Sequence, residues 1–467
     1  MTADVQLMQS EIPLLTDLYQ LTVTASLFEH GFTDLATFEV ATRRMPPNRG
    51  YLVAAGLERV LEILEEFRFD EAALAHLESL KLFKAEFLDH LSRLRFTGEV
   101  RAMPEGAVFF AGEPVVEIHA PIIEAQLVEP LVLNQIGFAS LCAAKAARCF
   151  SVAGGRRLVD FGLRRAQGAD AAMTLARSSY LCGFHGTSNV LAGKRYGIPA
   201  FGTMSHSYIM AHDNEREAFE HFVKSFPDLS TLLVDTYDTV RGVQIAAEIG
   251  KRLKAKGLHL RGVRLDSGDI FELARQSRRV LDDAGLHDTA IFASGNLDEY
   301  RIAELIEAGA PIDAFGVGTA LAVSDDAPAG DFTYKLTEYR GSPRIKTSTA
   351  KVSMPGRKQV FRAANPSGTP FADLVGLSDE SAATAAREFK PAPAKVAQLL
   401  EPQMQAGKRV APARSLAESR ERFMEEFAAL DGRHKSIRRP AEYSVKHTAA
   451  LNAMIISEKL RAESRQE

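Results

Sequence analysis

The chain has 467 residues, 46% of them hydrophobic and 25% charged, the composition of an ordinary globular protein long enough for two or three domains. Lys and Arg total 56 against 60 for Asp and Glu, and the resulting net charge of -4 argues against nucleic acid or an anionic membrane as a partner. The three cysteines form no CxxC pair, and the start MTADVQLMQSEIPLL lacks the basic and apolar segments of a signal peptide. We therefore expect a cytoplasmic protein with no cysteine-based metal site.

Residues 1–150 are expected to form a first domain. Helical spacing covers 14–30, 56–67 and 71–94. The segment GEVRAMPEGAVFFAGEPVVEIHAP, at 98–121, alternates apolar and polar residues between Pro-Glu-Gly and Ala-Gly-Glu-Pro turns. Such alternation predicts short antiparallel strands, so this domain is expected to be helical and sandwich-like, of the α+β type.

From about Arg157 to Arg340, a short apolar run, a polar loop and a helix-like stretch recur in turn. The runs are RRLVDF, IPAFGT, TLLVDT, LRGVRL, TAIFAS, DAFGVG and FTYKLTEY. Helix-like stretches at 241–257, 271–285 and 297–309 each end on a glycine suited to a helix C-cap. This rhythm is typical of βα units around a parallel sheet.

Polar clusters follow six of these runs, and they read FGLRRAQG, GTMSHS, DTYDT, RLDSGD, SGN and GVGT. A (β/α) barrel gathers the C-terminal ends of all its strands at one mouth, whereas a doubly wound sheet concentrates ligand contacts at a switch point. We therefore predict an α/β protein whose residues 151–345 form an irregular (β/α) barrel with the catalytic site.

Residues 346–467 begin with the PGRKQVFR loop and a Pro/Ala-rich stretch, FKPAPAKVAQ, and continue as a charged helical tail. We expect this C-terminal region to pack back on the first two domains. The role of the tail is left open by the sequence.

Several familiar signatures are absent. GVGTAL, at 316–321, starts like a dinucleotide fingerprint but lacks the third glycine, and the chain contains neither GxxxxGK[ST] nor HExxH. Hydride transfer and P-loop chemistry therefore lose most of their support.

The ordered clusters resemble the motifs of the nicotinate phosphoribosyltransferase family. LLTDLYQLT, DFGLRRAQG, GFHGTSN, GTMSHS, RLDSGD, SGN, GVGT, YKL and PGRKQVFR all match in order and content. The resemblance runs from about residue 14 to 363 and weakens in the tail.

The resemblance implies an ATP-dependent enzyme of NAD salvage biosynthesis. Nicotinate and 5-phosphoribosyl 1-pyrophosphate would give nicotinate mononucleotide and pyrophosphate, while ATP is hydrolysed through a phosphohistidine at His206. Mg²⁺ is the implied cofactor, although its ligands cannot be assigned, and the implied assembly is a homodimer with shared active sites. Asp266 is implied as the second catalytic residue.

Substrate contacts are implied by the same resemblance. Phe161 and, from the other subunit, Tyr19 would sandwich the pyridine ring; Arg264 and Thr203 would contact nicotinate; and Arg164 would meet pyridine or phosphate. The ribose hydroxyls or the metal would lie near Asp269 as well as Asp266, and the ribose 5-phosphate would be bound by Ser294, Gly295, Gly316, Gly318 and Thr319.

Each of these residues has a plainer interpretation from the sequence alone. His206 is also consistent with a helix-cap histidine, Phe161 and Tyr19 with core packing, and Arg264 with an ion pair at a barrel rim. The glycines are also those of tight turns.

Ser188 distinguishes this sequence from those of the related nicotinamide-specific enzymes. Nicotinamide-specific sister enzymes carry an aspartate at the matching position, which would repel a carboxylate, whereas serine would not. Three alternatives stay open: a nicotinamide-specific enzyme of the same fold, a catalytically inactive sensor of phosphorylated metabolites and, more distantly, a helix-rich scaffold protein.

Overall fold

The computed structural model describes residues 9–347 and 353–464. Its contacts divide the chain into two compact units. Unit 1 combines Met1–Leu141 with Ala329–Glu467, and unit 2 is the intervening Cys142–Pro328. Helix α6 (Glu129–Val152) runs through the first boundary between them.

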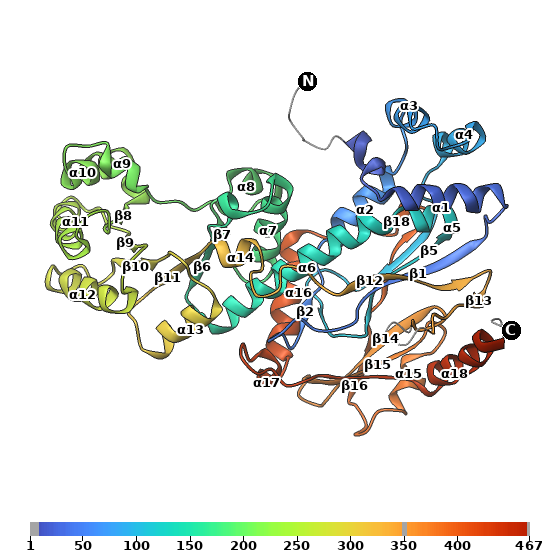
Figure 1. The fold of residues 1–467 in the computed structure, drawn as a ribbon. Coiled ribbons are helices and arrows are strands. Elements are labelled where there is room, and N and C mark those ends of the chain that lie inside the picture. The colour runs from blue at the N-terminus through green and yellow to red at the C-terminus, as the bar shows by residue number, and fades with distance from the viewer. Residues whose placement is uncertain (1–8, 348–352, 465–467) are drawn as a thin grey trace. The chain divides into compact units, whose positions relative to one another are not determined.

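Unit 2 contains a six-stranded sheet with the strand order β7-β6-β11-β10-β9-β8, in which every neighbouring pair is parallel. Its strands are β6 (Arg157–Asp160), β7 (Gly186–Thr187), β8 (Thr231–Leu233), β9 (Gly262–Leu265), β10 (Ala290–Ala293) and β11 (Ala314–Val317). Its helices after α6 are η2 (Leu163–Arg165), α7 (Ala169–Leu181), α8 (Val190–Tyr196), α9 (His206–Met210), α10 (Glu215–Ser225), η3 (Pro227–Leu229), α11 (Thr239–Lys254), α12 (Ile270–Asp283), α13 (Glu299–Glu307) and α14 (Thr319–Ala322) (Figure 1).

The centre of this sheet is built from short apolar strands that helices cover. Leu232, Val263, Ile291 and Phe315 are fully buried, as expected for strands of a parallel sheet with covered faces. Helices α11 and α12 pack against each other and against β9. The alternating βα order that the sequence predicts is therefore confirmed for five of its runs, those that contain β6, β8, β9, β10 and β11.

Two other runs behave differently. IPAFGT forms no strand, and only Ala200 makes an isolated bridge, with Thr187. FTYKLTEY forms β12 (Phe332–Tyr339), which pairs antiparallel with β1 in unit 1 instead of extending the parallel sheet. A parallel crossover from β11 would need a long connection, usually a helix, whereas the helix between β11 and β12 is the four-residue α14. The described pairings do not join β7 to β8, so closure into a barrel stays a prediction.

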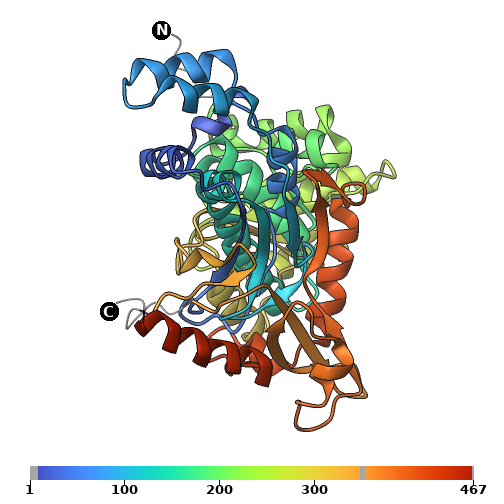
Figure 2. The same cartoon turned by 90° about the vertical axis from the view of Figure 1, so that its right-hand side faces the viewer.

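Unit 1 contains sheets of seven, four and two strands, in the orders β13-β12-β1-β5-β3-β17-β18, β16-β14-β15-β19 and β2-β4. Besides β12, its strands are β1 (Leu35–Thr42), β2 (Leu52–Val53), β3 (Glu99–Ala102), β4 (Val108–Phe109), β5 (Pro114–Pro121), β13 (Ser342–Pro343), β14 (Lys358–Ala364), β15 (Pro370–Leu377), β16 (Lys395–Gln398), β17 (Glu401–Gln405), β18 (Lys408–Arg409) and β19 (Ser444–His447). Its helices, apart from its share of α6, are η1 (Gln9–Leu14), α1 (Leu18–Glu29), α2 (Leu57–Glu66), α3 (Glu71–Ser79), α4 (Ala85–Arg93), α5 (Ile122–Leu127), α15 (Ala382–Ala386), α16 (Leu416–Ala429), α17 (Gly432–Lys435) and α18 (Ala449–Ser464). Helix α18, dark red in Figure 2, packs on β15.

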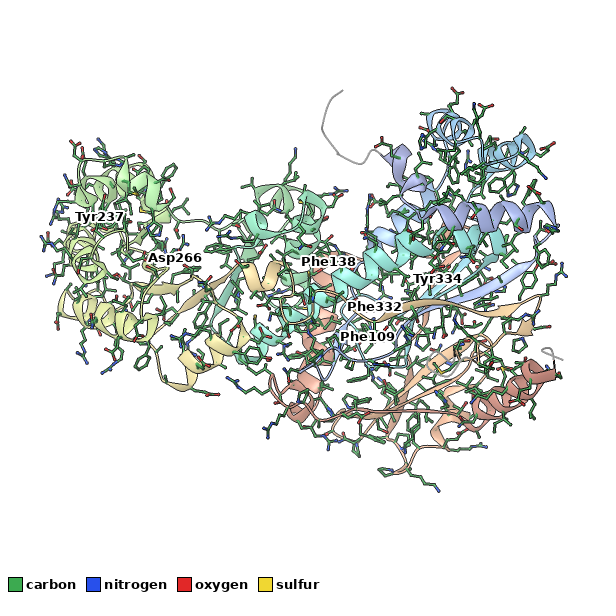
Figure 3. All side chains as sticks on the ribbon, viewed as in Figure 1. Phe109, Phe138, Tyr237, Asp266, Phe332 and Tyr334 are labelled. Carbon is green, nitrogen blue, oxygen red and sulfur yellow. The ribbon has the colours of Figure 1, made fainter. Side chains whose placement is uncertain are left out.

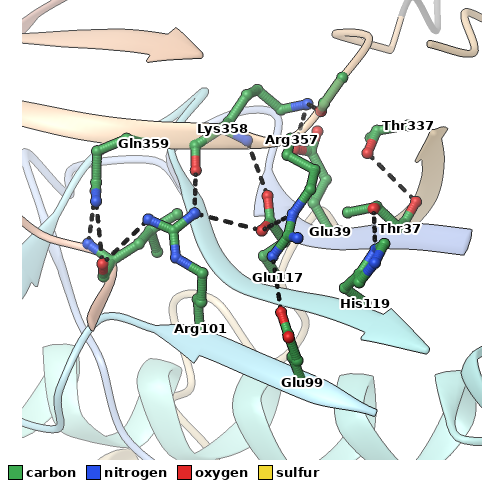
Figure 4. A network of polar contacts seen from close by, with 12 residues as sticks. Thr37, Glu39, Glu99, Arg101, Glu117, His119, Thr337, Arg357, Lys358 and Gln359 are labelled. Atoms are coloured by element: carbon green, nitrogen blue, oxygen red, sulfur yellow. Dashed lines mark hydrogen bonds and ion pairs between the residues drawn. The ribbon is translucent and has the colours of Figure 1, made fainter. Parts of the chain in front are cut away.

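Antiparallel pairing of the predicted segment 98–121 is confirmed, because β3 pairs with β5 in this way. The same seven-stranded sheet carries a buried polar network that fastens the PGRKQVFR segment (Figure 4). Glu117 on β5 accepts a hydrogen bond from the Lys358 backbone at 2.8 Å and pairs with Arg357 at 3.2 Å. The Lys358 ammonium lies 3.0 Å from Glu39 on β1.

Among the residues that the structure describes, no helix has both the length and the apolar character needed to cross a lipid bilayer.

Candidate functional site

Polar residues, a phenylalanine and a glycine lie where the parallel strands of unit 2 end. Phe161 follows β6, Ser188 follows β7, Asp266 follows β9, Ser294 follows β10 and Gly318 follows β11. Because parallel strands all run in one direction, these ends share one edge of the sheet (Figure 1). The sequence clusters therefore meet at that edge.

Arg264, near the end of β9, connects its own segment with the one after β10 and with the loop that holds Thr203. Its Nε donates to Ser294 Oγ at 2.8 Å, its Nη1 to Thr203 Oγ1 at 3.0 Å and its Nη2 to Asp266 Oδ1 at 2.7 Å. The guanidinium carbon lies 5.3 Å from the centroid of the Phe161 ring, and the side chain is only 12% exposed. A guanidinium has five N–H donors, and these three hydrogen bonds use three of them.

Asp266, labelled in Figure 3, faces this guanidinium as a carboxylate. Its Oδ1 also accepts from Ser294 Oγ at 2.5 Å. Burial opposes ionisation, but the Ser294 hydrogen bond and the Arg264 charge outweigh it and hold the pKa of Asp266 below its ordinary value. The site therefore contains a fixed negative charge directly beside a fixed positive one.

His206 is the first residue of α9, and the preceding Ser205 caps that helix by accepting from the Tyr208 backbone. The His206 Nδ1 lies 3.1 Å from Thr236 Oγ1, and its Nε2 lies 3.8 Å from Asp266 Oδ2. The side chain is 42% exposed. One ring nitrogen is thus oriented by a hydroxyl, while the other faces the carboxylate and is reachable from solvent.

Two glycines allow the close packing of this site. At Gly316 a Cβ would come within 2.6 Å of the Phe161 ring, which also packs against Phe292 at a centroid distance of 5.5 Å. Gly295 has a φ of +84° and faces the Asp266 carbonyl so closely that a Cβ would collide with it. A side chain at either position would displace a residue of the candidate site.

Five predicted residues make no contact with the Arg264 cluster in the described part of the chain. Asp269 caps α12, accepting from the Phe271 and Glu272 backbones, while Arg164 and Thr319 are exposed. Ser188 is half-buried, and its backbone N–H donates to the Asp160 carbonyl. Tyr19 belongs to unit 1 and is 51% exposed.

Asp235 and Thr236 belong to the site as well, although neither is among the site residues predicted from the sequence. Asp235 Oδ2 accepts from the Asp266 backbone at 3.1 Å and from Ser267 Oγ at 2.6 Å, and so orients the RLDSGD segment. The signal that could have identified both residues is the DTYDT cluster directly after β8.

A second carboxylate lies beside Asp235. Both Asp235 Oδ1 and Glu215 Oε1 are buried and accept no hydrogen bond from the described residues. Burial, and next the charge of Asp235, raises the pKa of Glu215 to about 7. Within 9–347 and 353–464 no group of three or more His, Cys, Asp or Glu residues is arranged to hold a metal ion.

Three family descriptions match almost the whole chain. They are the nicotinate phosphoribosyltransferase N-terminal domain at residues 14–137, the nicotinate phosphoribosyltransferase family at 156–352 and its C-terminal domain at 357–455.

Individual proteins agree with these matches. The chain is 55% identical over 349 residues to nicotinate phosphoribosyltransferase pncB2 of Mycobacterium tuberculosis, covering 75% of each chain. It is 32% identical to the human nicotinate phosphoribosyltransferase over 95% of this chain and 96% of that protein. The crystal structure of the human enzyme superposes with a TM-score of 0.84 at 31% identity, covering 95% of this chain and 99% of that one.

Proposed function

The chain belongs to the nicotinate phosphoribosyltransferase family, and from that premise we propose that it joins nicotinate to the phosphoribosyl group of 5-phosphoribosyl 1-pyrophosphate. The products are nicotinate mononucleotide, for NAD salvage, and pyrophosphate. The observation that supports this most directly is the Arg264 guanidinium, which lies over the Phe161 ring and uses three of its five N–H donors within the site.

Nicotinate is a flat ring with a carboxylate, so its site needs an aromatic face and a cation. Phe161 supplies the face, and the remaining N–H donors of Arg264 bind the carboxylate. Ser188, at the end of β7, adds no negative charge. In the proposed homodimer Tyr19 of the partner subunit covers the second face of the ring.

Transfer proceeds through a ribosyl group that carries positive charge at C1. As the bond from C1 to pyrophosphate breaks and the bond from C1 to the pyridine nitrogen forms, the ionised Asp266 stabilises that charge. Gly295, Gly316, Gly318 and Thr319, near the ends of β10 and β11, would hold the 5-phosphate through backbone N–H groups and the Thr319 hydroxyl. Ser294, also predicted for this role, already donates its hydroxyl to Asp266 and its backbone N–H to Leu265.

Mg²⁺ fits the carboxylates present here. It is ordinarily held by one or two carboxylates together with substrate phosphates, and it neutralises a departing pyrophosphate. Asp266 and Asp235 would hold it, since Asp235 Oδ1 accepts no hydrogen bond from the described residues. Asp269 lies in the same RLDSGD segment, but its side chain caps α12.

ATP coupling is proposed to pass through His206. With Nδ1 hydrogen-bonded to Thr236, the lone pair on Nε2 attacks the γ-phosphorus of ATP. The N–P bond forms as the P–O bond to ADP breaks, and water later hydrolyses the phosphohistidine to free phosphate. The exposure of the ring leaves room for the nucleotide to approach.

A product assay with nicotinate or nicotinamide, the ribosyl donor and Mg²⁺, with and without ATP, tests the proposal on the wild type and on His206→Ala. We expect nicotinate mononucleotide, and ATP stimulation in the wild type alone. Turnover of nicotinamide in preference to nicotinate would overturn the specificity, and turnover of neither would point to a metabolite sensor. Equal ATP stimulation of the variant would refute the role of His206.

A further inference from the structure

Two cations of α6 are buried in unit 2, away from the Arg264 cluster. The Lys145 side chain is 1% exposed, and its Nζ lies 2.7 Å from Glu299 Oε2, 2.7 Å from Asp325 Oδ1 and 3.0 Å from Asp326 Oδ1. Burial alone would lower the pKa of Lys145, but Glu299 and Asp325 outweigh it and raise that pKa. Lys145 therefore stays an ammonium ion.

Arg148 lies one helical turn further along and completes the cluster. Its Nε donates to Glu299 Oε1 at 2.8 Å, and its Nη2 donates to Tyr300 Oη at 2.8 Å. Each carboxylate oxygen of Glu299 therefore forms an ion pair with one cation: Oε1 with Arg148 and Oε2 with Lys145. The contact with Lys145 lacks hydrogen-bond geometry.

The carboxylates of this cluster belong to two segments that leave neighbouring strands. Glu299 is the first residue of α13, which the segment from Ser294 to Asp298 enters directly from β10. Asp325 and Asp326 lie three and four residues after the last residue of α14, whose N-cap is Gly318 at the end of β11. Lys145 and Arg148 thus link α6 to the C-terminal ends of both segments, at Glu299 in one and at Asp325 and Asp326 in the other.

We propose that Lys145 and Arg148 are positioning residues that hold these two segments at the separation needed to bind the ribose 5-phosphate. This inference rests on the proposed function, which gives both segments to that phosphate. A phosphate that is bound from two sides requires both segments to be ordered at once. If one segment is mobile, ordering it on binding costs free energy and weakens the binding of the phosphate. The effect falls mainly on the ribosyl donor, because neither Phe161 nor Arg264 contacts the buried ion pairs directly. Arg264 is coupled to them only through its hydrogen bond to Ser294, where the first segment begins.

The test compares Lys145→Met with the milder Asp325→Asn, whose side chain is 45% exposed, so that one variant folds even if the other does not. Arg409→Met is the matched control: this arginine pairs with Glu58 at 2.6 Å and Glu65 at 3.3 Å, in unit 1. Melting temperature, KM for each substrate and amide hydrogen exchange are measured for all of them.

We expect KM for the ribosyl donor to rise about 10- to 100-fold in Lys145→Met, as for a displaced binding group, with a smaller rise in Asp325→Asn. KM for nicotinate rises by a clearly smaller factor than KM for the donor. Exchange becomes faster at both 294–300 and 316–326, whereas Arg409→Met loses stability without changing the ratio of the two KM values.

An unchanged donor KM in folded variants, or an equal rise in both KM values, would overturn the inference. Failure of the proposed function is distinguishable, because it would appear in the wild type as no turnover of nicotinate. In that case calorimetric binding of ribose 5-phosphate decides: weaker binding by the variants supports the positioning role, and equal binding refutes it.

Discussion

Replacing Arg264 by lysine tests whether the site depends on the forked guanidinium or only on a positive charge. Lysine would keep an ion pair with Asp266 but cannot also reach Thr203 and Ser294, which accept at 3.0 and 2.8 Å. Each lost charge-assisted hydrogen bond contributes about 1.5 kcal/mol, so the two together contribute about 3 kcal/mol. If that loss falls on the bound transition state, kcat/KM for nicotinate drops about 100-fold.

Steady-state kinetics with nicotinate varied at saturating ribosyl donor would measure this loss. Arg275→Lys is the control, because Arg275 pairs with Glu272 on the exposed face of α12 and contacts no residue of the site. A value for Arg264→Lys within about three-fold of the wild type would show that charge alone is sufficient and would refute the reasoning from the fork.

Gly316→Ala should push the Phe161 ring aside and raise KM for nicotinate about ten-fold, while Gly432→Ala, which has open space, should not; equal KM values would contradict the packing argument. Ser188→Asp should lower kcat/KM for nicotinate about ten-fold and favour nicotinamide in competition assays, and no change in preference would remove Ser188 from specificity. Burial raises the pKa of Asp160 from 3.8 to about 6, so the native state retains a proton that the unfolded chain loses, and stability is lost as pH rises from about 4 to 6. Relative to Asp160→Asn, the wild type should lose about 2 kcal/mol of unfolding free energy from pH 4 to 7 in denaturant titrations; a difference independent of pH would count against this.

The strand-end clusters could be predicted because they depend on local patterns. Apolar runs such as TAIFAS identify the strands, and in a parallel sheet each run brings its own polar loop to the same edge. Arg264 and Asp266 meet Ser294 for this reason. Arg264 also binds Thr203, which lies about 60 residues earlier in the sequence.

Other features depend on contacts that no local pattern encodes. FTYKLTEY has the composition of any strand, and only its pairing with β1, some 300 residues away, places it in unit 1. Asp269 and Asp235 are both aspartates in polar clusters, yet one caps a helix and the other orients the segment that holds Asp266. The sequence alone gives no way to tell these two roles apart.

The guanidinium of Arg264 is shared by loops that leave different parts of the fold, and this limits how the chain can diverge. A substitution at Arg264 alone would strand the Asp266 carboxylate without its cation and leave Thr203 without its donor. We therefore expect substitutions at these positions to be tolerated best when several change together, even though the positions are distant in the sequence. Homologues with altered ring specificity are expected to differ at several of them together.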